Sequence, residues 1–214
     1  MVSRRFVGEV LVLLLLLGGV VSLNSGCISS QLTNVWMDPA YTGGPIKTML
    51  VIAVKKNAAA RRIWEDALVA ELSGHGVSPT PSYKLFPRAI PDTNEVGSAV
   101  EQNHIEGVLI VQRLPNQIAT YDHPGSRKSV PVTRYDRLKQ SYYTVYKEVY
   151  EPGYSDTLKV MRHQIDVWTT TNGGQLIWTG TGESLDPTSR EAVRNEITGL
   201  IAPELARQGI IPSK

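Results

Sequence analysis

Histidines and two serines near glycines are the side chains whose chemistry would serve catalysis or metal binding most directly. The histidines are widely separated, at His75, His104, His123 and His163. None belongs to an HExxH sequence and no CxxC motif is present, so the chain shows no local metal-binding motif. Ser98 and Ser184 lack the GxSxG context that presents a nucleophilic serine. We therefore expect no metal site, no cofactor and no catalytic centre.

Two further groups of residues could have a chemical role. Residues 180–182, Gly-Thr-Gly, come nearest to a phosphate-binding loop, but they lack the Walker lysine and the dinucleotide fingerprint. We interpret them as a strand twist or bulge. Glu65 and Asp66 occupy adjacent faces of one predicted helix and cannot both reach one site. With Arg61 and Arg62 we expect them to form a solvated, ion-paired face.

Cys27 is the only cysteine, and it follows a short apolar block. Arg4 and Arg5 precede that block, residues 10–21, which is shorter than the roughly 20 apolar residues of a membrane span. A charged start, a short apolar centre and small residues predict a secretory signal over residues 1–26. A lone cysteine in a secreted chain needs an explanation other than a disulfide.

Residues 23–27, Leu-Asn-Ser-Gly-Cys, resemble the lipobox of bacterial lipoproteins. The resemblance implies cleavage before Cys27 and covalent acylation of Cys27, with Gly26 and Ser25 as the small residues of the motif. Asn24 departs from it, because the family prefers an aliphatic residue there. The alternative is a plain secreted protein with a free thiol. Acyl chains would tether the protein to the membrane without inserting it.

Localisation and charge narrow the function classes. Ile28 follows the cysteine, where an aspartate would resemble the inner-membrane retention signal of enteric lipoproteins. The resemblance to lipoproteins without that aspartate implies the outer membrane, and we expect the chain to face the periplasm. Without residues 1–26 the chain has 188 residues, 20 basic and 19 acidic, a net charge of +1. Nucleic-acid binding requires a larger basic excess, so we expect no nucleic-acid partner.

The most promising binding region spans residues 121–154. It contains Tyr121, Tyr135, Tyr142, Tyr143, Tyr146, Tyr150 and Tyr154, and its first part carries Arg127, Lys128, Arg134, Arg137 and Lys139. Tyrosine supplies contact area and a hydrogen-bonding tip. We select as binding candidates Tyr121, Arg127, Lys128, Arg134, Tyr142 and Tyr146. The alternative is a long hairpin whose tyrosines form cross-strand pairs on a half-exposed sheet.

The first half of the chain predicts alternating strands and helices. Residues 48–54 read as a buried strand, and residues 58–73 have helical spacing ended by Gly74 and Gly76. We expect a polar strand over residues 83–86, a short helix capped by Asp92 or Thr93 and running to about residue 103, and a buried strand over residues 108–114.

The second half predicts adjacent antiparallel strands and a final helix. Residues 141–150 and 158–171 are rich in β-branched and aromatic residues, and Asn172-Gly173 is a hairpin turn into the strand at residues 176–178. Thr188 and Glu191 have capping-box spacing. We expect a helix after them with an apolar face, a kink at Pro203 and an end at Gly209.

Together these elements predict a single α/β (α+β) domain. We expect a mixed sheet of five to six strands, about three helices, and an antiparallel meander in the second half. The segments MLVIAV, RRIWEDALVAEL, GVLIVQRL and IDVWTTTNGGQLIWTGTGES, with the last helix, resemble uncharacterised proteobacterial lipoproteins. Their domain is similar to the TolB N-terminal domain and to lipoprotein activators of penicillin-binding proteins.

The sequence therefore predicts a signal peptide over residues 1–26, a lipidated tether and extended lead-in over residues 27–47, and a periplasmic domain over residues 48–214. We expect a non-catalytic binding or assembly module, anchored in the membrane by lipid. Its partner would be an envelope protein or an anionic glycan. Two alternatives stay open: an envelope hydrolase whose site is assembled from distant residues, and a small-ligand or lipid carrier with a deep apolar pocket.

Overall fold

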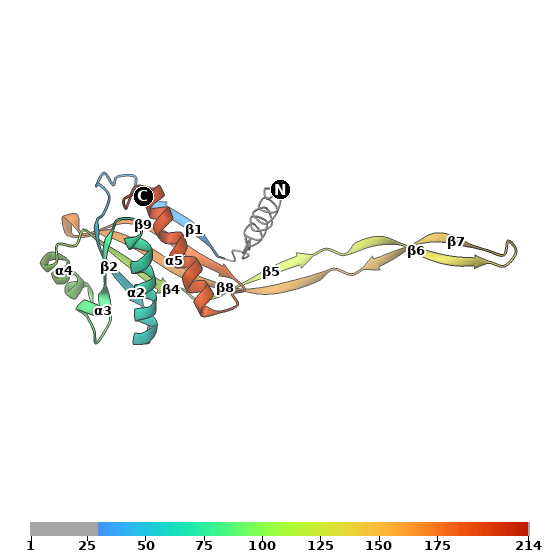
Figure 1. The fold of residues 1–214 in the computed structure, drawn as a ribbon, viewed down its shortest axis with the longest axis horizontal. Coiled ribbons are helices and arrows are strands. Elements are labelled where there is room, and N and C mark those ends of the chain that lie inside the picture. The colour runs from blue at the N-terminus through green and yellow to red at the C-terminus, as the bar shows by residue number, and fades with distance from the viewer. Residues whose placement is uncertain (1–29, 214) are drawn as a thin grey trace, which may run out of the picture.

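The computed structural model describes residues 30–213, without the side chains of residues 135, 136 and 172. This part of the chain has an α+β architecture with one mixed sheet (Figure 1). In chain order the elements are β1 (Ser30–Met37), β2 (Thr48–Val54), α2 (Ala58–Ser73), β3 (Ser78–Pro81), α3 (Ser82–Leu85), α4 (Thr93–Gln102), β4 (Gly107–Arg113), β5 (Gln117–His123), β6 (Ser126–Asp136), β7 (Ser141–Glu151), β8 (Tyr154–Thr169), the 3-10 turn η1 (Thr171–Gly173), β9 (Gln175–Leu185) and α5 (Arg190–Arg207).

The main sheet is larger than expected. Over the described residues it has seven strands in the order β1-β9-β8-β4-β2-β3, with β5 paired to one end of β8, and β6 and β7 form a separate two-stranded sheet. The prediction of five to six strands and about three helices was therefore too low, since four α-helices are described. No helix within residues 30–213 is long and apolar enough to cross a membrane.

Strand β2 is the centre of the parallel part of the sheet. It pairs in parallel with β3 on one side and with β4 on the other. Met49, Val51 and Ala53 belong to the cluster packed against α2 and α5, whereas Leu50 and Ile52 pack with residues of α3 and α4. Because both faces of the strand are covered, its sequence is a continuous apolar run, and its predicted bounds are confirmed.

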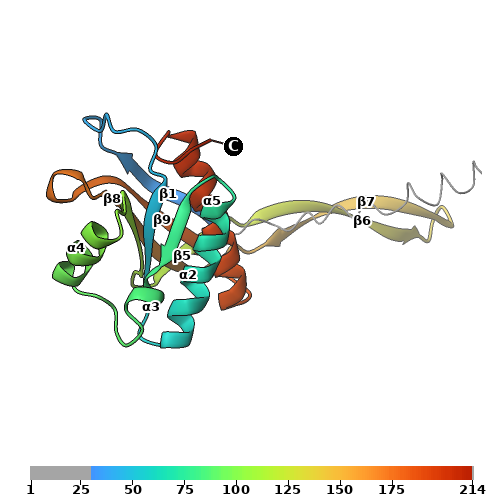
Figure 2. The same ribbon diagram turned by 60° about the vertical axis from the view of Figure 1, so that its left-hand side comes forward.

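Helices α2 and α5 lie on the same face of the sheet (Figure 2). The Asn57 side chain caps α2 by accepting hydrogen bonds from the backbone of Ala59 and Ala60. Leu68 and Leu72 of α2 are fully buried, and burial of a leucine side chain contributes about 1.5–3 kcal/mol. Gly182 of β9 lets α5 approach closely, because a Cβ there would lie 3.0 Å from Ile197 Cγ2. The predicted bounds of α2 are confirmed.

Several predicted elements are corrected. Residues 83–86 do not form a strand: Ser82–Leu85 is helix α3, and the strand is β3. Pro79 and Pro81 fit β3 because it lies at the edge of the sheet, where one side of the strand needs no partner. The cap of α5 is Ser189 rather than Thr188. Ser30–Met37, expected within the tether and lead-in, is strand β1 and pairs with β9.

Part of the second half extends out of the rest of the fold as a long arm (Figure 1). The expected pairing of residues 141–150 with residues 158–171 is wrong, because β7 pairs with β6 whereas β8 pairs with β4, β5 and β9. We define the arm as residues 117–159, which comprise β5, β6, β7 and the first part of β8, and the body as the other described residues. Strands β5 and β8 pair at its base, and β6 and β7 pair with each other at its far end. None of the arm's described side chains is buried, so the arm has no hydrophobic core of its own.

Candidate functional site

The tyrosine-rich segment forms the arm. Tyr121 lies at its base on β5, opposite Asp156, while Tyr142 and Tyr146 lie on β7. In the β6–β7 pairing Tyr135 is opposite Tyr142, Arg134 is opposite Tyr143, and Arg127 is opposite Tyr150. The hairpin that we considered as an alternative arrangement is therefore present, and it projects away from the body.

The strand alternation divides the six predicted binding residues between two faces and the base. Successive side chains on a strand point to opposite faces, so Tyr142, Tyr146 and Tyr150 share one face of β7, and Arg127 lies on that face of β6. Lys128 and Arg134 belong to the other face. At about 3.4 Å per residue, Arg127 and Arg134 are roughly 24 Å apart along the strand. These residues therefore form an extended surface rather than one compact site.

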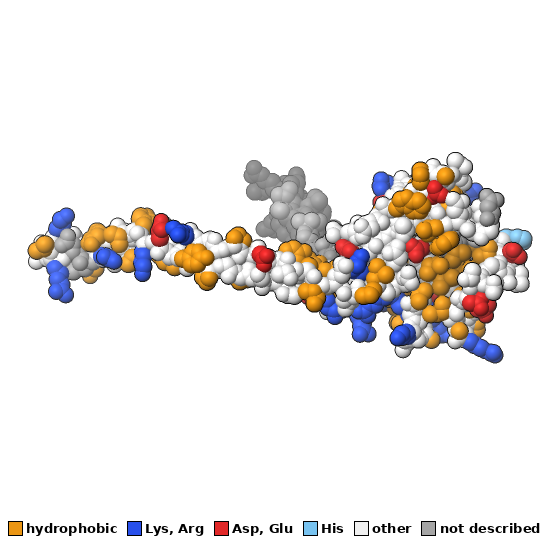
Figure 3. All heavy atoms as spheres, turned by 180° about the vertical axis from the view of Figure 1, so that it is seen from behind, with side chains coloured by type: hydrophobic (Ala, Val, Ile, Leu, Met, Phe, Trp, Pro, Cys, Tyr) orange, Lys and Arg blue, Asp and Glu red, His pale blue; other side chains and the backbone are white. Residues whose placement is uncertain are grey.

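The hairpin exposes both aromatic and basic side chains. The exposed fractions are 76% for Tyr142 and 73% for Tyr146, and Leu138 at the tip is 97% exposed. Residues 126–151 carry six basic and three acidic residues, and Figure 3 shows lysine and arginine side chains gathered at the tip. Lys128 is paired with Glu151 at 2.7 Å. The hairpin is an extended, positively charged surface with apolar patches.

A joint separates the base of the arm from the hairpin. Pro124-Gly125 and Pro152-Gly153 interrupt the two strands at facing positions. A Cβ on Gly153 would lie 2.6 Å from the carbonyl oxygen of His123 and 2.8 Å from the backbone nitrogen of Gly125. Only glycine allows the backbones to approach so closely. The joint fixes where the base ends and the hairpin begins.

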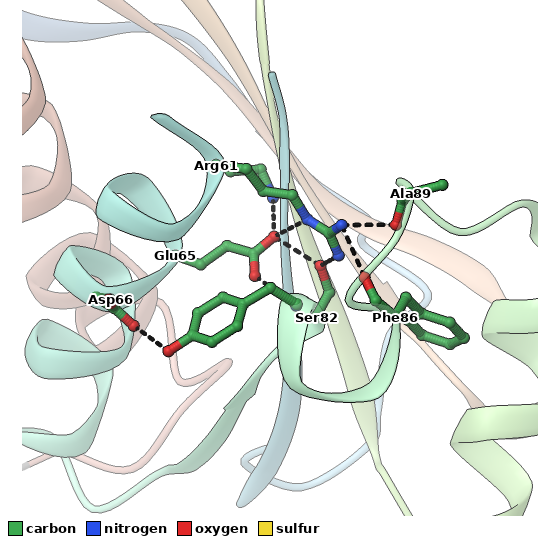
Figure 4. A network of polar contacts seen from close by, with 8 residues as sticks. Arg61, Glu65, Asp66, Ser82, Phe86 and Ala89 are labelled. Carbon is green, nitrogen blue, oxygen red and sulfur yellow. Dashed lines mark hydrogen bonds and ion pairs between the residues drawn. The ribbon is translucent and has the colours of Figure 1, made fainter. Parts of the chain in front are cut away.

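The predicted solvated face of α2 is wrong for Arg61 and Glu65. Both side chains are buried, and their ion pair is part of a network that ties α2 to α3 (Figure 4). Glu65 accepts hydrogen bonds from Arg61 Nε at 2.9 Å, from Ser82 Oγ at 2.6 Å and from two backbone amides. Arg61 donates to the carbonyl oxygens of Phe86 and Ala89. Because the charges are paired and hydrogen-bonded inside the fold, this network has a structural role.

The serines considered as nucleophiles are engaged elsewhere. Ser98 Oγ donates to the carbonyl oxygen of Asn94 at 3.0 Å. Ser184 Oγ hydrogen-bonds with Ser30 Oγ, which donates to a carboxylate oxygen of Glu196. Among the described residues no group of three histidine, cysteine, aspartate or glutamate side chains is arranged to hold a metal. Cys27, the expected acylation site, lies outside the described residues.

The body contains a basic pocket of about 690 Å³ that the sequence did not predict. It opens where the parallel strands β2 and β4 end, between the first turns of α2 and α5. Ligands of open α/β sheets commonly bind at the carboxyl ends of the strands. The polar part of its lining is Lys55, Lys56, Asn57, Gln112, Arg113, His163 and Arg190, and none of the described residues that line it is acidic.

Trp64 forms one wall of this basic pocket. Lys55 Nζ lies 4.1 Å from the centre of a Trp64 ring, and the His163 ring stacks on Trp64 at 4.7 Å between centroids. Burial, together with the charges of Lys55 and Arg113, lowers the pKa of His163 to about 3. Burial and the Arg113 charge lower the pKa of Lys55 to about 8. The pocket therefore disfavours additional positive charge.

The pocket residues could not be grouped from the sequence because they are far apart in it. Parallel pairing of β2 with β4 brings Lys55 near Arg113, and antiparallel pairing places His163 opposite Arg113. One local signal was present: two lysines and an asparagine cap directly follow a buried strand and precede a helix. That signal alone did not identify the pocket, because the sequence does not show that Arg113 of the neighbouring parallel strand lies beside it.

Comparisons with known proteins give no family. No protein-family model and no curated protein matches the chain. Among solved structures it is similar to the PelC dodecamer from Paraburkholderia phytofirmans, with 13% identity and a TM-score of 0.43 over 84% of this chain and 97% of that chain. A PDZ domain protein from Parabacteroides distasonis has 12% identity and a TM-score of 0.34 over 84% and 36% of the two chains.

Proposed function

We propose that this protein is a lipid-anchored, non-catalytic assembly module of the bacterial envelope, and that the hairpin of the arm binds an acidic envelope protein. The observation that carries the proposal is the hairpin itself, which exposes Tyr142, Tyr146 and Tyr150 on one face. A two-stranded hairpin is marginally stable in water, and burial of its tyrosines by a partner would stabilise it. Its basic excess selects a partner of negative charge.

The backbone of the hairpin supports a protein partner over a glycan. Strands β6 and β7 pair only with each other among the described elements, so each has an outer edge with unpaired backbone groups. An extended peptide can add to such an edge through main-chain hydrogen bonds. The serine contacts described above favour binding over hydrolysis, because Ser98 and Ser184 already bond to other groups.

Photocrosslinking in cells tests this binding surface. The full chain carries a benzoylphenylalanine in place of Tyr146, and the control carries it in place of Glu71, an exposed residue of α2 on the body. We expect a discrete protein adduct from position 146 alone. An adduct without protein would instead indicate a glycan. No adduct above the level of position 71 would contradict the proposal.

The second test neutralises hairpin cations and measures the dependence of binding on salt. Arg127→Gln, Lys128→Gln and Arg134→Gln together are expected to weaken formation of the adduct, with the largest difference at low ionic strength. The control replaces three exposed body cations, Lys47, Lys84 and Arg88, with glutamine. Equal adduct yields from both triple variants would show that these hairpin cations do not select the partner.

The lipid anchor is tested separately on Cys27. Wild-type protein made in a Gram-negative host is expected to have the mass of a chain cleaved before Cys27 plus acyl groups, and to sediment with membranes. Cys27→Ser is expected to stay unprocessed. A soluble, unacylated wild-type protein would contradict the anchor and leave the hairpin proposal to its own tests.

A further inference from the structure

The basic pocket between the first turns of α2 and α5 has no place in the binding surface of the arm. It combines four cationic side chains, Lys55, Lys56, Arg113 and Arg190, with apolar walls that include Trp64, Leu114, Met161 and Val193. Among the described residues none of these four cations lies within ion-pair distance of a carboxylate. Like charges gathered without a counter-charge are unfavourable in the empty pocket.

A second observation points to a ligand. His163 lines the pocket and is 2% exposed, yet its buried Nδ1 atom has no hydrogen-bond partner among the described residues. A buried polar atom normally has a partner, and leaving it without one costs stability. The lining of the pocket therefore includes an imidazole whose need for a polar partner the described residues do not meet.

The backbone adds to the positive electrostatic potential of the pocket. Asn57 and Ala60 at the start of α2 line the pocket, as do Arg190 and Val193 at the start of α5. The first turn of a helix carries a partial positive charge, and two such ends meet at this edge of the sheet. Together with the four cations they favour a ligand group with more than one negative charge.

We propose that this pocket binds a small phosphate monoester whose phosphate is held by Lys55, Arg113 and Arg190 and whose organic part packs on Trp64. A dianionic phosphate offsets more of the positive charge than a monocarboxylate does. The volume of about 690 Å³ accommodates a small organic ligand. The ligand is a free phosphorylated metabolite or a phosphomonoester lipid headgroup, since both offer the same contacts.

Calorimetric titration of the full chain with phenyl phosphate tests the proposal. Each charge-assisted hydrogen bond contributes enough that Arg113→Gln or Arg190→Gln should weaken binding about tenfold. Both side chains are exposed, so these variants are expected to fold. The matched control is Lys47→Gln with Lys84→Gln, which removes exposed body cations outside the pocket and should leave the affinity unchanged.

Two further titrations sharpen the result. Benzoate is expected to bind at least about tenfold more weakly than phenyl phosphate because it carries one charge fewer. Affinity for phenyl phosphate should fall as the pH rises through about 8, where Lys55, which shares the pocket with Lys56, Arg113, Arg190 and the neutral His163, loses its proton. Dihexanoyl phosphatidic acid, which is water-soluble, distinguishes the sources: tighter binding than phenyl phosphate identifies a lipid headgroup, and weaker binding a free metabolite.

Three results would overturn the proposal. One is the absence of saturable binding of both phenyl phosphate and the phosphatidic acid. The second is equal loss of affinity in the pocket variants and in the Lys47, Lys84 control. The third is benzoate binding as tight as that of phenyl phosphate. None of these results bears on the hairpin, which lies in the other part of the molecule.

Discussion

The body buries a cluster of apolar side chains from β2, β4, β8, β9, α2 and α5, whereas the arm leaves every described side chain at least partly exposed. Both parts contain β-strands, and they share strand β8. In the body, burial of apolar surface outweighs the entropy lost by ordering the chain. In the arm the free energy gained by burial of apolar surface is small. Its tyrosines therefore contribute little to folding, and their exposed surface can contact a partner.

The largest predicted effect lies in the body, at Glu65. Glu65→Leu removes the acceptor of Arg61 and Ser82 and leaves a buried guanidinium without its counter-charge, which costs about 3–5 kcal/mol. Glu71→Leu, at an exposed position of the same helix, should change the free energy of unfolding by less than about 0.5 kcal/mol. Urea unfolding of both variants measures the difference. Equal, small losses would show that the Arg61–Glu65 network does not hold α2 to α3.

A smaller effect is expected from the acid sensitivity of the body. The folded-state pKa of His163 is about 3, below the ordinary value of 6.5, so the unfolded chain binds a proton that the folded chain does not. The stability contributed by neutral His163 is present above about pH 6.5 and is lost as the pH falls towards 3. The loss amounts to about 2 kcal/mol between about pH 7 and pH 5.

The free energy of unfolding of His163→Leu, measured as a function of pH beside the wild type, gives the contribution of His163. We expect the variant to have a shallower decline of stability between about pH 6.5 and pH 4 than the wild type. An identical slope in both proteins would mean that His163 is protonated in the folded state at acid pH, in contradiction to its burial.

A still smaller change in stability is predicted for Gly153→Ala at the joint of the arm. The new Cβ would meet the backbone of His123 and Gly125, so the facing strands must separate. Because the body does not pack on this joint, the free energy of unfolding should change by about 1 kcal/mol or less. Amide chemical shifts should move within residues 117–159 and not in the body. The control, Gly97→Ala in α4, has open space around its Cβ and should leave the arm signals unchanged.

The difference between body and arm also explains which features the sequence could predict. The bounds of β2 follow directly from a buried apolar run, and those of α2 from helical spacing ended by glycine; both are confirmed. The expected cap at Asp92 or Thr93 located the start of α4 in the same way, and Asp92 is the cap. In these segments each local signal agrees with the environment that the fold provides.

The remaining features depend on contacts between distant segments. Ser30–Met37 is a strand because β9 offers it a partner, and Glu65 is buried because α3 folds over it. The tyrosines of residues 121–154 were identified from composition, but their division between two faces required the β6–β7 register. Likewise, only the sheet topology brings Lys55, Arg113 and His163 to one pocket.

The most direct test of this account removes the hairpin. A chain in which Gly125 is joined to Pro152, without residues 126–151, lacks β6 and β7 but retains every strand of the main sheet. We predict that its free energy of unfolding in urea lies within about 1 kcal/mol of the value for the full chain, since no buried side chain is lost. A loss of about 3 kcal/mol or more would contradict the account, because the hairpin would then be part of the folded core rather than a surface kept for a partner.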